Sequence, residues 1–289
     1  MNESSPAGFR ERLRLNVAPV VPLTRYLLLT TETHAFCAAL AFFALVAFYP
    51  VSSMLLAWAR YALRFERAHE VVVLALKEYY PEAQDFLLRN LEVSVKLHGD
   101  EVFRHAFWIL LGAAGVFIPL ETAFNRLWGF TVHRPYWRNQ LMGLLLTAAS
   151  SVLAVAFVLL TAGVHAVLAK VALPPLAAEI ARSLSLRMTA LAFSVTAFAL
   201  FYRYLPNGRV RTADVVPAAV LAGLAAEAVR LLYVLALPLL DLRRTQGPYF
   251  VSISFVLLAY FEAFVLLGGA YIAAGRRAVT GPGPEPASR

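Results

Sequence analysis

The sequence predicts an all-α membrane protein, a bundle of six transmembrane helices with a helical segment between the first and the second. Of its 289 residues, 60% are hydrophobic and only 15% are charged. Soluble domains contain about 25% charged residues, so a soluble chain of this size could not bury so much apolar surface behind so little charge. The same composition excludes a disordered chain, a collagen and a disulfide scaffold.

Six apolar runs are long enough to cross a bilayer, which takes about 20 helical residues for a hydrocarbon core of roughly 30 Å. The second run continues past Glu121, and the fourth is the shortest. Arg187 and Arg203 at the ends of the fourth run can extend to the membrane surface. The runs cover residues 35–59, 105–125, 139–169, 188–202, 215–240 and 249–273, within a membrane domain predicted over 31–275.

The remaining parts of the chain flank or interrupt this bundle. The N-terminal tail, 1–30, is predicted to be cytoplasmic and to carry a short amphipathic helix, and the C-terminal tail, 276–289, is predicted to be disordered. The segment 60–104 is predicted to be helical and extramembrane, because residues 82–97 place charged side chains on one helical face and apolar ones on the other. We expect a helical hairpin packed on the membrane domain; an interfacial flap over a cavity is the alternative.

Arginines beside the predicted helix ends indicate the orientation. The formal net charge is +8, and basic residues collect at the cytoplasmic face of membrane proteins. Six crossings place both termini on one side, and the clusters on that side are Arg134, Arg138, Arg203, Arg209, Arg211, Arg276 and Arg277. We therefore expect a multi-pass membrane protein with both termini in the cytoplasm. Nucleic acid, the other partner that a basic chain suggests, is not expected.

Motifs of soluble enzymes do not occur in the sequence. It contains no P-loop, no GxSxG and no HExxH motif. Its six histidines include no pair at helical spacing, and Cys37 is the single cysteine, so a metal site is not predicted. We expect a protein that is not an enzyme and that carries no cofactor.

Four ionisable side chains lie inside the predicted transmembrane helices. A charge at bilayer depth costs at least about 2.5–3.5 kcal/mol, so such a side chain faces protein or water. Glu227 and Arg230 are three residues apart and can pair on one helical face. Glu262 has no cation nearby on its own helix, so it is either neutral or bonded to Arg230 across the helix interface. Together with Glu121, these residues are candidates for a substrate pathway; the alternative is that they hold the helices together.

Four stretches of the sequence carry a family resemblance through their order and spacing. They resemble the YihY/virulence factor BrkB family of bacterial inner-membrane proteins over residues 30–275. The third stretch is the strongest match, and the chain departs from the family pattern at Tyr271 and Ala259, where many members have a glutamate and a tryptophan. The four stretches are 38–51 (AALAFFALVAFYPV), 121–129 (ETAFNRLWG) followed by 134–138 (RPYWR), 201–223 (FYRYLPNGRVRTADVVPAAVLAG) and 264–274 (FVLLGGAYIAA).

The resemblance implies six membrane helices in the bacterial inner membrane with both termini cytoplasmic. It implies no settled biochemical activity, although the family has been suspected of handling envelope lipids or other amphiphiles. Arginines beside membrane helices can hold phosphate headgroups, and topology alone also explains arginines there. The headgroup-contact candidates are Arg134, Arg138, Arg203, Arg209 and Arg211.

The charged residues and the resemblance together suggest a protein that binds or moves an amphiphile, such as an anionic lipid, across or within the inner membrane. Membrane lipids are the expected partners, and the sequence leaves a homo-oligomer open. A non-transporting membrane scaffold or envelope-assembly factor is the alternative, with 60–104 as its docking surface. An enzyme inside the membrane would need catalytic groups that converge at one depth, and the spacing shows none.

Overall fold

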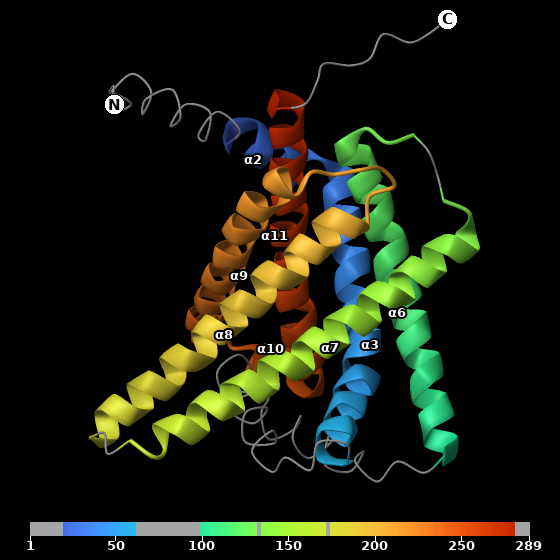
Figure 1. Ribbon diagram of the computed structural model, residues 1–289. Coiled ribbons are helices and arrows are strands. Elements are labelled where there is room, and N and C mark those ends of the chain that lie inside the picture. Colours follow the sequence, from blue (N-terminus) through green and yellow to red (C-terminus); the bar gives the residue numbers. More distant parts are fainter. Residues whose placement is uncertain (1–19, 62–98, 132–133, 172–173, 281–289) are drawn as a thin grey trace, which may run out of the picture.

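A computed structural model describes residues 20–61, 99–131, 134–171 and 174–280 (Figure 1). All the regular elements of these residues are helices, so the predicted all-α class is confirmed. The amphipathic stretch 82–97 and most of the predicted extramembrane segment 60–104 lie outside the described residues. The elements are α2 (Val20–Leu29), α3 (Thr31–Tyr61), α6 (Gly99–Trp128), α7 (Tyr136–Leu168), α8 (Pro175–Tyr204), α9 (Thr212–Leu240), α10 (Leu242–Gln246), the 3-10 turn η1 (Gly247–Tyr249) and α11 (Phe250–Thr280).

Five of the described helices are long and apolar enough to cross a membrane, namely α3, α7, α8, α9 and α11. The protein is therefore a multi-pass helical membrane protein. The remaining long helix, α6, has 30 residues and corresponds to the predicted second crossing. It is not among the five, and several of its side chains lie outside the described part of the chain. The count of six crossings thus stays a prediction.

Several helices are longer than the apolar runs that predict them. The largest difference is in α8, which begins at Pro175 rather than near residue 188. Glu179, Arg182 and Arg187 interrupt the apolar run, but they are compatible with a helix, and proline suits its first turn. At the other end of the chain α11 continues to Thr280, so the predicted boundary of the C-terminal tail at 276 is too early. Residues 281–289 lie outside the described residues.

The helices form a bundle, and we call one of its ends the basic end because the elements there carry Arg134, Arg138, Arg203, Arg209, Arg211 and Arg276. Figure 1 shows α3, α6 and α11 running alongside one another, with α7 and α8 as an oblique antiparallel pair. The basic end comprises α2, the start of α3, the α6–α7 loop, the α8–α9 turn and the last turns of α11. Tyr26 of α2 stacks on Tyr271 of α11, with ring centroids 4.9 Å apart. The described chain therefore starts and finishes at the same end of the bundle, as two termini on one side of a membrane require.

The core of the bundle depends on small residues that let helices approach closely. Ala218, Ala219 and Ala226 of α9 are fully buried. A Cβ atom on Gly223 would lie only 2.5 Å from Cγ2 of Val195 in α8, so this position admits no larger side chain without movement. α9 is thereby held tightly against α8, which places their polar side chains at a common interface.

Candidate functional site

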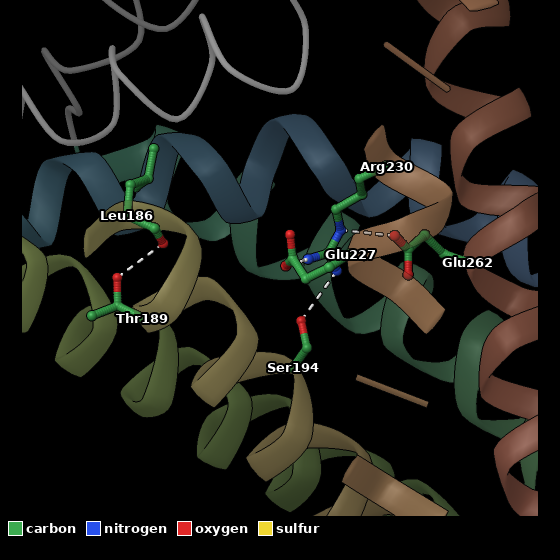
Figure 2. A network of polar contacts seen from close by, with 6 residues as sticks. All are labelled: Leu186, Thr189, Ser194, Glu227, Arg230 and Glu262. Carbon is green, nitrogen blue, oxygen red and sulfur yellow. Dashed lines mark hydrogen bonds and ion pairs between the residues drawn. The ribbon is translucent and has the colours of Figure 1, made fainter. Parts of the chain in front are cut away.

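Four side chains from three helices form a polar cluster in the middle of the bundle (Figure 2). We call this set, which comprises Ser194, Glu227, Arg230 and Glu262, the Arg230 cluster. The Arg230 guanidinium donates from Nη1 to Glu227 Oε1 at 2.5 Å and from Nε to Glu262 Oε1 at 2.8 Å. It also donates from Nη2 to Ser194 Oγ at 3.2 Å. One arginine thus connects α8, α9 and α11.

Helix geometry explains why these residues meet. Glu227 and Arg230 are separated by three residues on α9, so they lie on the same face, and this predicted pair is confirmed. Of the two alternatives for Glu262, the structure shows the bond to Arg230, which crosses the α9–α11 interface. At a rise of 1.5 Å per residue, Glu227 lies about 22 Å from the start of α9, close to the middle of the helix.

The charged side chains of the cluster are largely, but not fully, buried. Arg230, Glu227 and Glu262 expose 20%, 18% and 22% of their side-chain surfaces. Removing charges from water is costly, and mutual pairing offsets only part of that cost. The remaining exposure means that a small polar group could reach the cluster without complete unfolding of the bundle.

Ser194 is the member that the sequence analysis does not identify. The residue is 3% exposed, and its hydroxyl accepts a hydrogen bond from Arg230. A lone serine in an apolar run carries no distinctive spacing, because serine is common in transmembrane helices. Only the packing of α8 against α9 reveals its role.

Further polar contacts follow the α7–α8 interface away from the cluster. Thr161 and Thr189 share a hydrogen bond of 2.8 Å between their hydroxyls, and Thr189 also donates to the Leu186 carbonyl at 3.0 Å (Figure 2). One turn further on, His165 Nε2 lies 3.1 Å from Ser185 Oγ. These hydroxyl and imidazole groups therefore line the α7–α8 interface toward the end of that helix pair.

Glu121 lies elsewhere in the bundle. It is buried near the basic end, about 10 Å from the last residue of α6 at a helical rise of 1.5 Å per residue. Among the described residues its hydrogen-bond partner is Asn125, whose Nδ2 donates to Oε1 at 3.4 Å. Oδ1 of Asn125 accepts a bond of 2.8 Å from the Asn207 backbone N–H. The contacts therefore group Glu121 with the α8–α9 turn and not with the Arg230 cluster.

Two of the headgroup-contact candidates bind backbone carbonyls. Arg134 donates from Nη1 to the Leu205 carbonyl at 3.1 Å and from Nη2 to the Pro206 carbonyl at 3.0 Å. Arg203 donates to the Val210 carbonyl. Carbonyl groups after the end of a helix need such donors, so both arginines stabilise the α8–α9 turn. The sequence alone does not predict this role, because the carbonyl partners lie about seventy residues from Arg134 and seven from Arg203 in the chain, and it suggests headgroup contact for both residues instead.

The other three candidates, Arg138, Arg209 and Arg211, are exposed at the basic end. The guanidinium carbon of Arg138 lies 5.1 Å from the centroid of the Trp137 ring. Trp137 and its neighbour Tyr136 are themselves strongly exposed. Exposed aromatic rings at a helix end are typical of the membrane–water interface.

Arg134 and Arg138 form a matched pair for a stability test. We expect Arg134→Ala to lower the free energy of unfolding by about 1.5–3 kcal/mol, because it removes charge-assisted hydrogen bonds and leaves carbonyls unpaired. Arg138→Ala, which removes an exposed side chain, should change it by less than about 0.5 kcal/mol. Thermal unfolding of both variants in detergent measures the difference, and equal melting temperatures would contradict the assignment.

The chemistry of this site is that of ion pairing and hydrogen bonding. Within the described residues, no group of three or more histidine, cysteine, aspartate or glutamate side chains could hold a metal ion. The Arg230 cluster offers instead a guanidinium, which binds carboxylate or phosphate through two parallel hydrogen bonds. Fold and site together define a multi-pass helical membrane protein with a charged cluster at mid-bundle.

The chain belongs to the virulence factor BrkB family, whose family model matches residues 28–288. The resemblance found in the sequence is therefore confirmed. No curated protein and no solved structure matches the chain. Two of the stretches that carry the resemblance meet in space. Asn125 and Arg134, from the stretch 121–138, bond to the turn Leu205–Pro206–Asn207 in the stretch 201–223. These motifs thus hold the basic end of the bundle together.

Proposed function

We propose that this protein binds an anionic amphiphile, with an anionic phospholipid as the simplest example, and moves its headgroup through the membrane along the Arg230 cluster. The observation that carries the proposal is a guanidinium held at mid-helix with about one fifth of its surface exposed. Ionisable side chains at membrane depth usually mark the path of a substrate or ion. Guanidinium is also the side-chain group best matched to a phosphate.

Lipid movement along the Arg230 cluster also requires a surface at which anionic headgroups collect, and we assign this role to the basic end. Arg138, Arg209 and Arg211 are exposed there, and basic residues at the membrane surface attract anionic lipids. In the proposed orientation this end is cytoplasmic, the membrane is the bacterial inner membrane, and α6 forms a sixth crossing. The proposed partners are membrane lipids and not nucleic acid, and the proposed activity breaks no covalent bond.

The test is lipid movement in vesicles that contain the purified protein. Fluorescent phosphatidylglycerol is incorporated in both leaflets, and a reductant that cannot cross the membrane bleaches the outer one. We expect further bleaching at a rate above that of empty vesicles, because labelled lipid moves outward.

Arg230→Lys should reduce the protein-dependent rate by about tenfold or more, since lysine keeps the charge but cannot bond in the forked geometry. Arg244→Lys, an exposed change at the opposite end of the bundle, is the matched control and should move lipid at the wild-type rate. A wild-type rate equal to that of empty vesicles would contradict the proposed function.

A further inference from the structure

The hydrogen bonds of Arg230 restrict how a phosphate can bind there. Nε carries a single hydrogen, and it is donated to Glu262 Oε1. The side-on edge of a guanidinium, which presents Nε and one Nη, binds two phosphate oxygens at once. A phosphate on this edge must therefore displace the Glu262 carboxylate. Glu227 can keep its bond, because it is donated by Nη1, whereas the edge that presents Nε is completed by Nη2.

The displaced carboxylate would lose its partner in a surrounding of low polarity. Glu227, Arg230 and Glu262 together carry a formal charge of −1, and a phosphodiester headgroup adds another negative charge. Isolated buried charges of this kind are strongly disfavoured, and carboxylates avoid the penalty by taking up a proton. Uptake of one proton would return the site to its original charge.

The neighbouring helices offer few other groups for that proton. Among the described residues, the charged side chains whose fields reach Glu262 are Arg230 and Glu227, both on α9. The α8 side of the cluster contributes the hydroxyl of Ser194. From α3, His34 bonds through Nδ1 to the hydroxyl of Tyr260 at 2.8 Å and through Nε2 to the Leu28 carbonyl at 3.1 Å, so its ring bonds to groups other than Glu262.

We propose that an anionic headgroup binds at Arg230 together with one proton, and that Glu262 is the group that takes up this proton. The inference rests on the proposed function and adds the coupling ion to it. The proton comes from the aqueous phase and forms an O–H bond on the Glu262 carboxylate, while the phosphate oxygens replace that carboxylate on Arg230. No bond of the lipid is formed or broken.

The experiment measures binding and proton uptake without requiring lipid movement. Purified protein in phosphatidylcholine nanodiscs is titrated with dihexanoyl phosphatidylglycerol at several pH values in weak buffer that contains an indicator dye. We expect one proton taken up per lipid bound, and an affinity that rises by up to about tenfold for each pH unit of acidification. An infrared difference spectrum should show a new carboxylic acid C=O band.

Two conservative variants separate the carboxylates. Glu262→Gln should bind the lipid with no proton uptake, no new carboxylic acid band and an affinity that does not depend on pH. Glu179→Gln, which changes an exposed carboxylate near the start of α8 and outside the Arg230 cluster, should keep both the uptake and the pH dependence. Lipid binding that is independent of pH in the wild type, or equally pH-dependent in Glu262→Gln, would overturn the inference and leave the proposed function standing.

Two further outcomes concern the ligand. If the lipid neither binds nor moves, the proposed function and the inference fail together. A parallel titration with inorganic phosphate distinguishes a free anion from a lipid headgroup. Proton uptake with phosphate and none with the lipid would support Glu262 as the proton acceptor but would overturn the assignment of an amphiphile as the ligand.

Discussion

Replacing Arg230 with methionine is expected to lower the free energy of unfolding by about 3–5 kcal/mol. The variant leaves Glu227 and Glu262 close together without the guanidinium to which both bond. Breaking a buried ion pair by removing one partner is costly because an uncompensated charge remains inside the protein. Thermal unfolding in detergent, compared with wild type, measures the loss. An unchanged melting temperature would show that the pairs contribute nothing to stability.

A triple variant separates the stability of the cluster from its function. Replacing Glu227 and Glu262 with leucine and Arg230 with methionine removes all the charges at once, and such replacements are often neutral or stabilising. We therefore expect the triple variant to unfold near the wild-type temperature but to move no lipid. If the triple variant moves lipid at the wild-type rate, the charged side chains of the cluster only hold the helices together and take no part in lipid movement. The scaffold alternative would then gain support.

Gly269→Ala is expected to destabilise the bundle by about 1–3 kcal/mol through overpacking. The added Cβ would lie 2.1 Å from the Tyr202 hydroxyl and 2.7 Å from the Ala222 Cβ. Tyr202 is fully buried, and its hydroxyl donates to the Leu266 carbonyl at 2.9 Å. The ring therefore has no room to retreat without breaking this bond, and α8, α9 and α11 must separate.

Two other glycines of α11 provide matched controls for this prediction. At Gly268 an added Cβ would meet Leu27 at 3.4 Å, an ordinary contact, and at Gly275 it would meet nothing within 4 Å. Alanine at Gly275 should be neutral or stabilise the helix by up to about 1 kcal/mol. The three alanine variants should therefore rank Gly269→Ala lowest in melting temperature. Equal temperatures for all three would contradict the close packing at Tyr202.

Composition and charge spacing alone predict the positions of the long helices and one of the ion pairs. The apolar runs locate each long described helix, because the bilayer permits few ways to satisfy backbone hydrogen bonds. The i,i+3 spacing of Glu227 and Arg230 predicts their ion pair, because residues three apart lie on the same face of a helix. The partner of Glu262 stays open in the sequence, since a choice between a neutral acid and a bond to Arg230 depends on how α9 and α11 pack.

The features that the sequence does not predict depend mostly on contacts between segments far apart in the chain. Pro175 begins α8 inside a stretch that hydropathy assigns to a loop, because charged residues at a helix end weaken the apolar signal without weakening the helix. Arg134 looks like a membrane-surface arginine until its carbonyl partners, about seventy residues further along the chain, are known. Ser194 joins the cluster only through the close approach of α8 and α9.

The bridge from Arg134 to the α8–α9 turn has a mechanical consequence. It links the residues just before α7 to the turn that follows α8, whereas Figure 1 shows the opposite tips of the pair, the last turn of α7 and the first turn of α8, projecting from the rest of the bundle. Because the pair is fixed at the Arg134 end, any tilting of α7 and α8 moves their opposite tips the most. Spin labels near those tips should therefore report larger displacements than labels beside Arg134.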